Sequence, residues 1–68
     1  MATPDPSSLA AELSALTETI MRSRERVASL AEPYLGTDRE DIVSALYEAE
    51  RQLLAAERGL ERALRTAR

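Results

Sequence analysis

The side chains that could do chemistry in this sequence are of few kinds. Its 68 residues include no histidine and no cysteine, so the commonest metal ligand, the commonest general base and any reactive thiolate are missing. Carboxylates are plentiful, but a di-iron helical bundle also needs histidines on its facing helices. No glycine-rich phosphate loop and no nucleophile beside a base can be identified. We therefore predict no enzymatic activity, no metal and no cofactor.

The arginines could instead bind phosphate groups or acidic partners. All nine basic residues are arginine, against twelve acidic residues, for a net charge of −3. An arginine face follows from the spacing of four residues near the C-terminus: Arg51, Arg58, Arg62 and Arg65. Three acidic residues recur every seven positions in the first half: Glu18, Glu25 and Glu32. These faces can be solvated surfaces, charge-guided docking surfaces, or, for the arginines, an RNA-binding face. The acidic net charge disfavours RNA.

Apolar spacing predicts the helices that carry these charges. Steps of three and four residues run through both halves of the chain, a pattern typical of amphipathic helices. In the first half the pattern comprises Leu9, Leu13, Leu16, Ile20, Val27, Leu30 and Tyr34. In the second half it comprises Ile42, Leu46, Ala49, Leu53, Ala56, Leu60, Ala63 and Ala67. We predict a lead at 1–6, a helix at about 6–32, a turn at 33–37 and a helix at about 38–67.

Local start signals support these boundaries. Asp5 before Pro6 is typical of an N-cap followed by proline at the first helical position. Thr37 and Glu40 have the spacing of a capping box, in which each side chain accepts a hydrogen bond from the other residue's backbone amide. Gly36 suits a left-handed conformation in the turn between the helices. The expected fold is all-α: a two-helix antiparallel coiled-coil hairpin, formed by one domain at 7–68.

Folding the hairpin about this turn places Arg24 opposite Glu50. The pair is either a half-exposed ion pair of small energy or a polar contact that fixes the register of the helices. In the same register the leucines of the first helix face alanines of the second. Gly59 lies inside the second helix, where a close approach of a neighbouring helix would compensate for its low helix propensity.

The second helix carries more apolar surface than one neighbouring helix covers. The side chains beside its seam are Val43, Tyr47, Leu54 and Leu64, and Met21 is similar on the first helix. We expect this face, with Arg24 and Glu50, to bind a second copy, completing a four-helix bundle, or another helical protein. The hypothesis is a small adaptor, regulator or assembly subunit; the alternative is an RNA-binding dimer that uses the arginine face.

The location of the protein is predicted from what the sequence does not contain. No run of about 18 apolar residues is present, so no membrane partner is expected. The N-terminal residues have neither the positive region nor the apolar region of a signal peptide, and a cytoplasmic protein is expected. The lysine-free, alanine-rich composition indicates a GC-rich bacterial genome.

Overall fold

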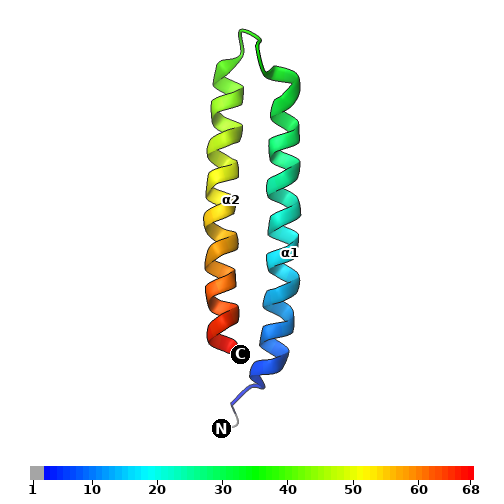
Figure 1. Ribbon diagram of the computed structural model, residues 1–68, viewed down its shortest axis with the longest axis vertical. Helices are drawn as coiled ribbons and strands as arrows, with labels where there is room; N and C mark the ends of the chain where they lie inside the picture. The colour runs from blue at the N-terminus through cyan, green and yellow to red at the C-terminus, as the bar shows by residue number, and fades with distance from the viewer. Residues whose placement is uncertain (1–2) are drawn as a thin grey trace.

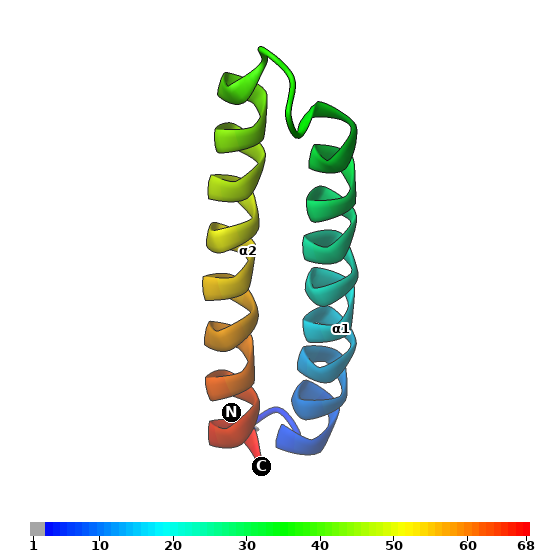
Figure 2. The same ribbon diagram turned by 45° about the horizontal axis from the view of Figure 1, so that its top comes forward.

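Two long helices of opposite direction make up the protein. The computed structural model describes residues 3–68, with α1 at Pro6–Ala31, a short 3-10 turn η1 at Glu32–Tyr34, and α2 at Glu40–Ala67. The helices lie side by side, and the start of α1 lies at the same end of the hairpin as the end of α2 (Figure 1). Turning the molecule leaves the two helices adjacent (Figure 2). The first two residues of the predicted lead, 1–2, lie outside the described residues.

The start of α1 confirms the predicted cap. Asp5 is the N-cap and Pro6 occupies the first turn. The Ser7 backbone amide donates to Asp5 Oδ1 at 3.0 Å, and the Ser7 hydroxyl donates to Asp5 Oδ2 at 2.9 Å. The carboxylate therefore satisfies an amide that the first turn of a helix leaves without a partner.

The start of α2 differs from the predicted capping box. Its N-cap is Arg39, whose side chain makes no capping bond, and the helix begins at Glu40. The Thr37 hydroxyl donates to the Tyr34 carbonyl at 2.6 Å and accepts from the Arg39 amide at 3.2 Å. Because that hydroxyl is bound within the turn, it does not cap Glu40. The connection is longer than the predicted 33–37, and Gly36 lies within it at a φ of +74°.

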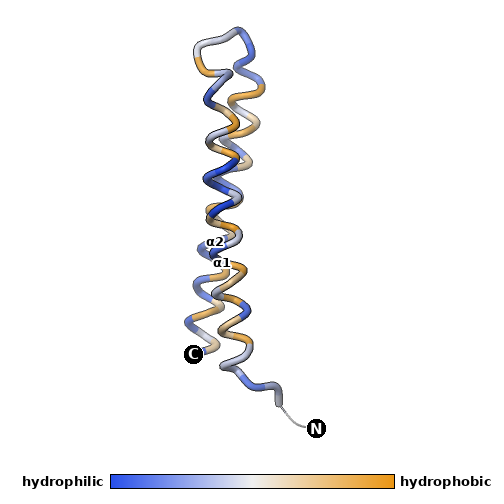
Figure 3. The backbone as a smooth tube through the Cα atoms, turned by 90° about the vertical axis from the view of Figure 1, so that its right-hand side faces the viewer, coloured by the Kyte–Doolittle hydropathy of each residue, from blue (hydrophilic) through white to orange (hydrophobic). Residues whose placement is uncertain are grey.

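The contact between the helices follows a regular pattern of three and four residues. Hydrophobic positions recur along both helices in Figure 3. The covered positions of α1 are Ala10, Leu13, Thr17, Ile20, Ser23, Arg24, Val27, Ala28 and Ala31. The half-buried positions of α2 are more numerous and form a broader arc: Ile42, Val43, Leu46, Tyr47, Ala49, Glu50, Leu53, Leu54, Glu57, Gly59, Leu60, Glu61, Leu64 and Ala67. Within residues 3–68 only Ala31 is fully buried, so the hairpin has almost no core of its own.

This seam is rotated relative to the predicted one. On α1 the leucines of every second predicted position are exposed and the next residues, Ala10, Thr17 and Ala31, are covered, which turns α1 by about half of the 100° step between residues. Leu9, Leu16 and Leu30 are consequently 49%, 52% and 51% exposed. On α2 the predicted Ile42 and Ala49 stay half-buried, and the shift is seen further along the helix. Ala56 and Ala63, predicted to face these leucines, are also exposed.

The rotation has a physical reason in the breadth of the apolar arc of α2. One helix covers a stripe of roughly 100° on its neighbour. A seam centred on Leu46, Leu53 and Leu60 lies in the middle of the apolar arc of α2. With this seam α1 partly covers both sides of the arc, and the uncovered apolar surface falls on α1.

The shape of the hairpin leaves an unusually large surface in solvent. The chain measures 58 × 18 × 13 Å with a radius of gyration of 16.3 Å, whereas a compact domain of this length has about 11 Å. Its accessible surface is 5189 Å², whereas a compact protein of 7.5 kDa has about 4,200 Å². None of the described helices is long and apolar enough to cross a membrane.

Candidate interaction face

The predicted apolar face of α2 is partly covered by the hairpin itself. All four of its side chains are half-buried: Val43, Tyr47, Leu54 and Leu64. Met21, predicted to extend this face on α1, is 36% exposed. The hairpin itself therefore covers part of this flank, and its role as an interface stays a prediction.

The largest exposed apolar side chains lie instead on α1 and in the turn. We define the leucine stripe as Leu9, Leu16 and Leu30. Their spacing in multiples of seven residues places them on one side of α1, and each has about half of its surface in solvent. Tyr34, four residues after Leu30 and 40% exposed, continues this side into the turn.

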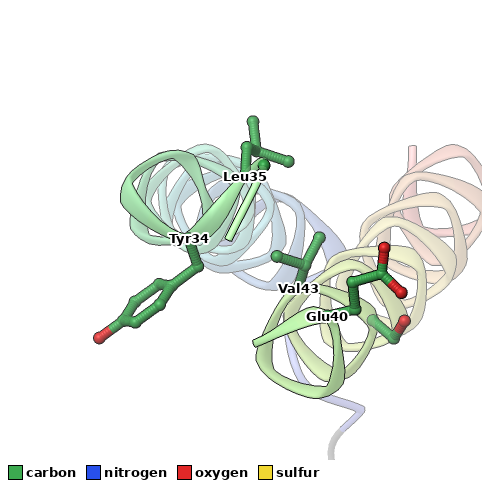
Figure 4. A pocket seen from close by; sticks show the side chains of 6 residues that line it. Tyr34, Leu35, Glu40 and Val43 are labelled. Atoms are coloured by element: carbon green, nitrogen blue, oxygen red, sulfur yellow. The ribbon is translucent and has the colours of Figure 1, made fainter. Parts of the chain in front are cut away.

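Tyr34 and Leu35 point in opposite directions at the turn. Figure 4 shows Tyr34 directed away from Val43 and Leu35 on the other side of the turn. Both line a small hollow of about 250 Å³, together with Gly36 and Glu40. Leu35 is 50% exposed but does not belong to the leucine stripe.

Two surface hollows lie along the leucine stripe. We call the first the end groove; it has a volume of about 770 Å³ and lies where the two chain ends meet. Its lining is Pro6, Leu9, Leu13, Ala63, Thr66, Ala67 and Arg68. The second, the middle hollow, has a volume of about 390 Å³ and is lined by Glu12, Ala15 and Leu16. Both are open and neither is a closed ligand cavity.

The one ion pair between the helices joins Arg24 to Glu57 within residues 3–68. Arg24 Nε lies 3.4 Å from Glu57 Oε1, and the side chains are 26% and 12% exposed. Glu50, the predicted partner, is half-buried and makes no ion pair within the described residues. Side chains on a helix lean toward its N-terminus, so the two long side chains of an antiparallel pair reach past the directly opposite residue.

Two charged residues lie on the leucine stripe without a partner in the hairpin. Glu12 lies between Leu9 and Leu16 on the helix surface, and Arg26 lies four residues before Leu30. Both are exposed, and neither forms an ion pair within residues 3–68. The side of α1 that is richest in exposed leucine therefore carries one negative and one positive charge.

The arginine face lies on the outside of α2. All four of its residues are exposed: Arg51, Arg58, Arg62 and Arg65. Arg51 is paired with Glu48, which lowers the pKa of that carboxyl. On α1, Glu18 pairs with Arg22 at 3.7 Å. The charged spines are thus solvated and partly paired within their own helices, and the RNA-binding face stays a prediction.

The exposed carboxyls near the helix starts are shifted by local hydrogen bonds. The Ser7 amide and hydroxyl lower the pKa of Asp5, and the Arg39 guanidinium lowers the pKa of Asp41. These bonds hold caps and turns in place. Within residues 3–68 no three acidic side chains converge in a way that could hold a metal ion.

The leucine stripe could not be recognised from the apolar pattern of one helix. Its leucines fit the three–four spacing of α1, which predicts that they face α2. The breadth of the apolar arc on α2 was a usable signal for the side of α2 that faces α1, but it does not select a side of α1. The polar residue Arg24 takes a seam position, which the pattern of α1 alone disfavours.

Comparison with known proteins gives no further assignment. No family model matches the chain, and neither the curated proteins nor the solved structures contain a significant match.

Proposed function

We propose that this chain is a non-enzymatic interaction module, a small helical adaptor, regulator or assembly subunit that docks another polypeptide on the leucine stripe. The observation that carries the proposal is the exposure of Leu9, Leu16 and Leu30, each near one half, on one side of α1. Exposed apolar surface gathered on one side of a folded protein marks interaction sites. Docking of a helix on this side would complete a helical bundle.

The energy balance of the hairpin supports the same proposal. A chain of 68 residues is close to the size at which one apolar core barely offsets chain entropy. This hairpin has a single fully buried residue within the described range, and no disulfide is available because the chain lacks cysteine. Association with another helical surface supplies the apolar burial that the hairpin lacks.

Site-specific photocrosslinking in the cells that make the protein tests the proposal. A benzoylphenylalanine at Thr19, which is exposed and lies three residues after Leu16, should crosslink to a polypeptide. The matched control is the same probe at Arg58, exposed on the outside of α2, where little crosslinking is expected. Equal crosslinking from both positions, or none from Thr19, would contradict the proposal.

A further inference from the structure

The leucine stripe has a twofold pattern along α1. Leu9 and Leu30 lie at equal distances from residues 19–20, near the middle of the helix, and so do Leu16 and Ser23. A second α1 running in the opposite direction would therefore place leucine against leucine at both ends. Near the centre it would place Leu16 against the smaller Ser23, where large and small side chains interdigitate.

The charges on the stripe follow the same pattern with opposite signs. Glu12 and Arg26 are symmetric about residue 19, within half a residue of the centre of the leucine pairs, so an antiparallel second α1 would bring each Glu12 within one position of an Arg26 of the other chain, within reach of their long side chains. The two groups are exposed and have no ion-pair partner within residues 3–68 of their own chain. A parallel second α1 in register would instead place like charges together, which opposes binding.

We infer that the occupant of the leucine stripe is a second copy of this chain, with α1 packed antiparallel on α1 and the two turns at opposite ends. This inference rests on the proposed function and specifies the partner. The contact is isologous: both chains use the same surface, so if residue i of one chain contacts residue j of the other, residue j of the first also contacts residue i of the second. The dimer consequently has two Glu12–Arg26 contacts, one on each side of the twofold axis.

The hollows on this face match side chains that the second copy brings to them. The middle hollow, lined by Glu12, lies where the guanidinium of Arg26 from the second copy arrives. The end groove lies beside Leu9, where Leu30 and Tyr34 of the second copy arrive. Leu30 and Tyr34 are 51% and 40% exposed in the single hairpin, so both are accessible to the groove of a second copy.

The extended hairpin leaves more surface available to a partner than a compact protein does. The hairpin exposes roughly 900 Å² more than a compact protein of its mass. A standard protein interface buries about 800 Å² per partner. The centre of such an interface is depleted of charge, and the leucine stripe carries only Glu12 and Arg26 beside its apolar residues.

Distances between spin labels test the arrangement on the full chain. The protein has no cysteine, so Thr19→Cys and Ser29→Cys give single labelling sites on exposed positions of α1. In the antiparallel dimer the labels at position 19 lie near the twofold axis, within about 20 Å, because packed helices are 8–10 Å apart. The labels at position 29 are separated by about 19 residues along the axis, or about 28 Å. Short distances at both positions would overturn the antiparallel arrangement.

Charge exchange tests the contact between Glu12 and Arg26. Glu12→Arg and Arg26→Glu should each raise the dimer dissociation constant about tenfold, because each change places like charges together at two symmetric sites. The double variant should restore the dissociation constant to within about threefold of the unchanged chain. Glu25→Arg makes the same charge change on the other side of α1 and should alter the constant less than threefold. Equal effects of Glu12→Arg and Glu25→Arg would overturn the contact.

The outcomes separate this inference from the proposed function. Crosslinks from Thr19 to the same chain, with the label distances above, support both. Crosslinks from Thr19 to a different polypeptide, with a monomeric purified chain, overturn the second-copy inference and leave the proposed function standing. A monomeric chain with no crosslinks from Thr19 overturns both.

Discussion

Shortening one leucine of the stripe gives the sharpest test of its role. Fully burying a leucine side chain stabilises a protein by about 1.5–3 kcal/mol. Leu16 is 52% exposed in the hairpin, so covering the rest contributes about 0.8–1.5 kcal/mol per chain, or about 1.5–3 kcal/mol per twofold dimer. Leu16→Ala should therefore raise the dimer dissociation constant about 10- to 150-fold.

Leu35 supplies a matched control for this substitution. It is the same residue type with nearly the same exposure, 50%, but it lies on the opposite side of the turn from Tyr34 (Figure 4). Leu35→Ala should change the dissociation constant less than about threefold, because no contact with the second copy is lost there.

Sedimentation equilibrium over a range of concentrations measures both constants, and circular dichroism checks that the helices are retained. Alanine is the strongest helix former and leucine is close to it, so the helical content of the Leu16→Ala variant should hardly change. Equal constants for the two variants, or a Leu16→Ala variant that associates as tightly as the unchanged chain, would refute the reasoning.

Three further predictions concern the hairpin itself. Arg24→Ala should lower the free energy of unfolding by about 1–2 kcal/mol in urea titrations, because it leaves the mostly covered Glu57 carboxylate unpaired; no loss would show that the pair is inert. Gly59→Ala should raise the thermal midpoint, since alanine is favoured over glycine by up to about 1 kcal/mol and the new Cβ would meet only the Arg62 side chain at 3.7 Å; a lower midpoint would reveal a close neighbour at Gly59. Three exposed carboxyls have a pKa lowered in the folded chain by local hydrogen bonds: Asp5, Asp41 and Glu48. Their stabilisation is present above the unfolded-state pKa values and is lost as pH falls through the folded ones, so helical content followed by circular dichroism should decrease below about pH 4, and constant helicity down to pH 2 would contradict this.

The helices and their order could be predicted because the signals are local. The three–four spacing of apolar residues and the Asp5–Pro6 start depend on neighbours within one turn of helix, and the structure confirms two helices with that cap. The start of α2 was less predictable. Thr37 can cap the helix or bind within the turn, and the choice is set by the Tyr34 carbonyl, which the path of the turn brings to its hydroxyl.

The seam could not be derived from either helix alone. On α1 a seam through Leu9 and Leu16 buries more apolar surface than one through Ala10 and Thr17. The structure has the second, together with a seam on α2 that lies in the middle of the apolar arc from Val43 to Leu64. The location of the exposed leucine stripe depends on which sides of the two helices meet, so the apolar pattern of one helix did not predict it.

The pairing of Arg24 shows a second limit of the same kind. Counting residues from the turn identifies the position directly opposite, near Glu50. The side chains lean along the helices and reach Glu57 instead, two turns further along α2.

Solvent exposure of individual leucine methyl groups tests the central claim most directly. In a single hairpin Leu16 and Leu35 are 52% and 50% exposed, so a soluble paramagnetic agent should broaden their methyl resonances equally. If a second copy covers the leucine stripe, the Leu16 methyls of the purified chain should be broadened several-fold less than those of Leu35. Equal broadening at a concentration of about 1 mM would show that the stripe lies in water when the chain is alone, and would contradict the account of a twofold dimer.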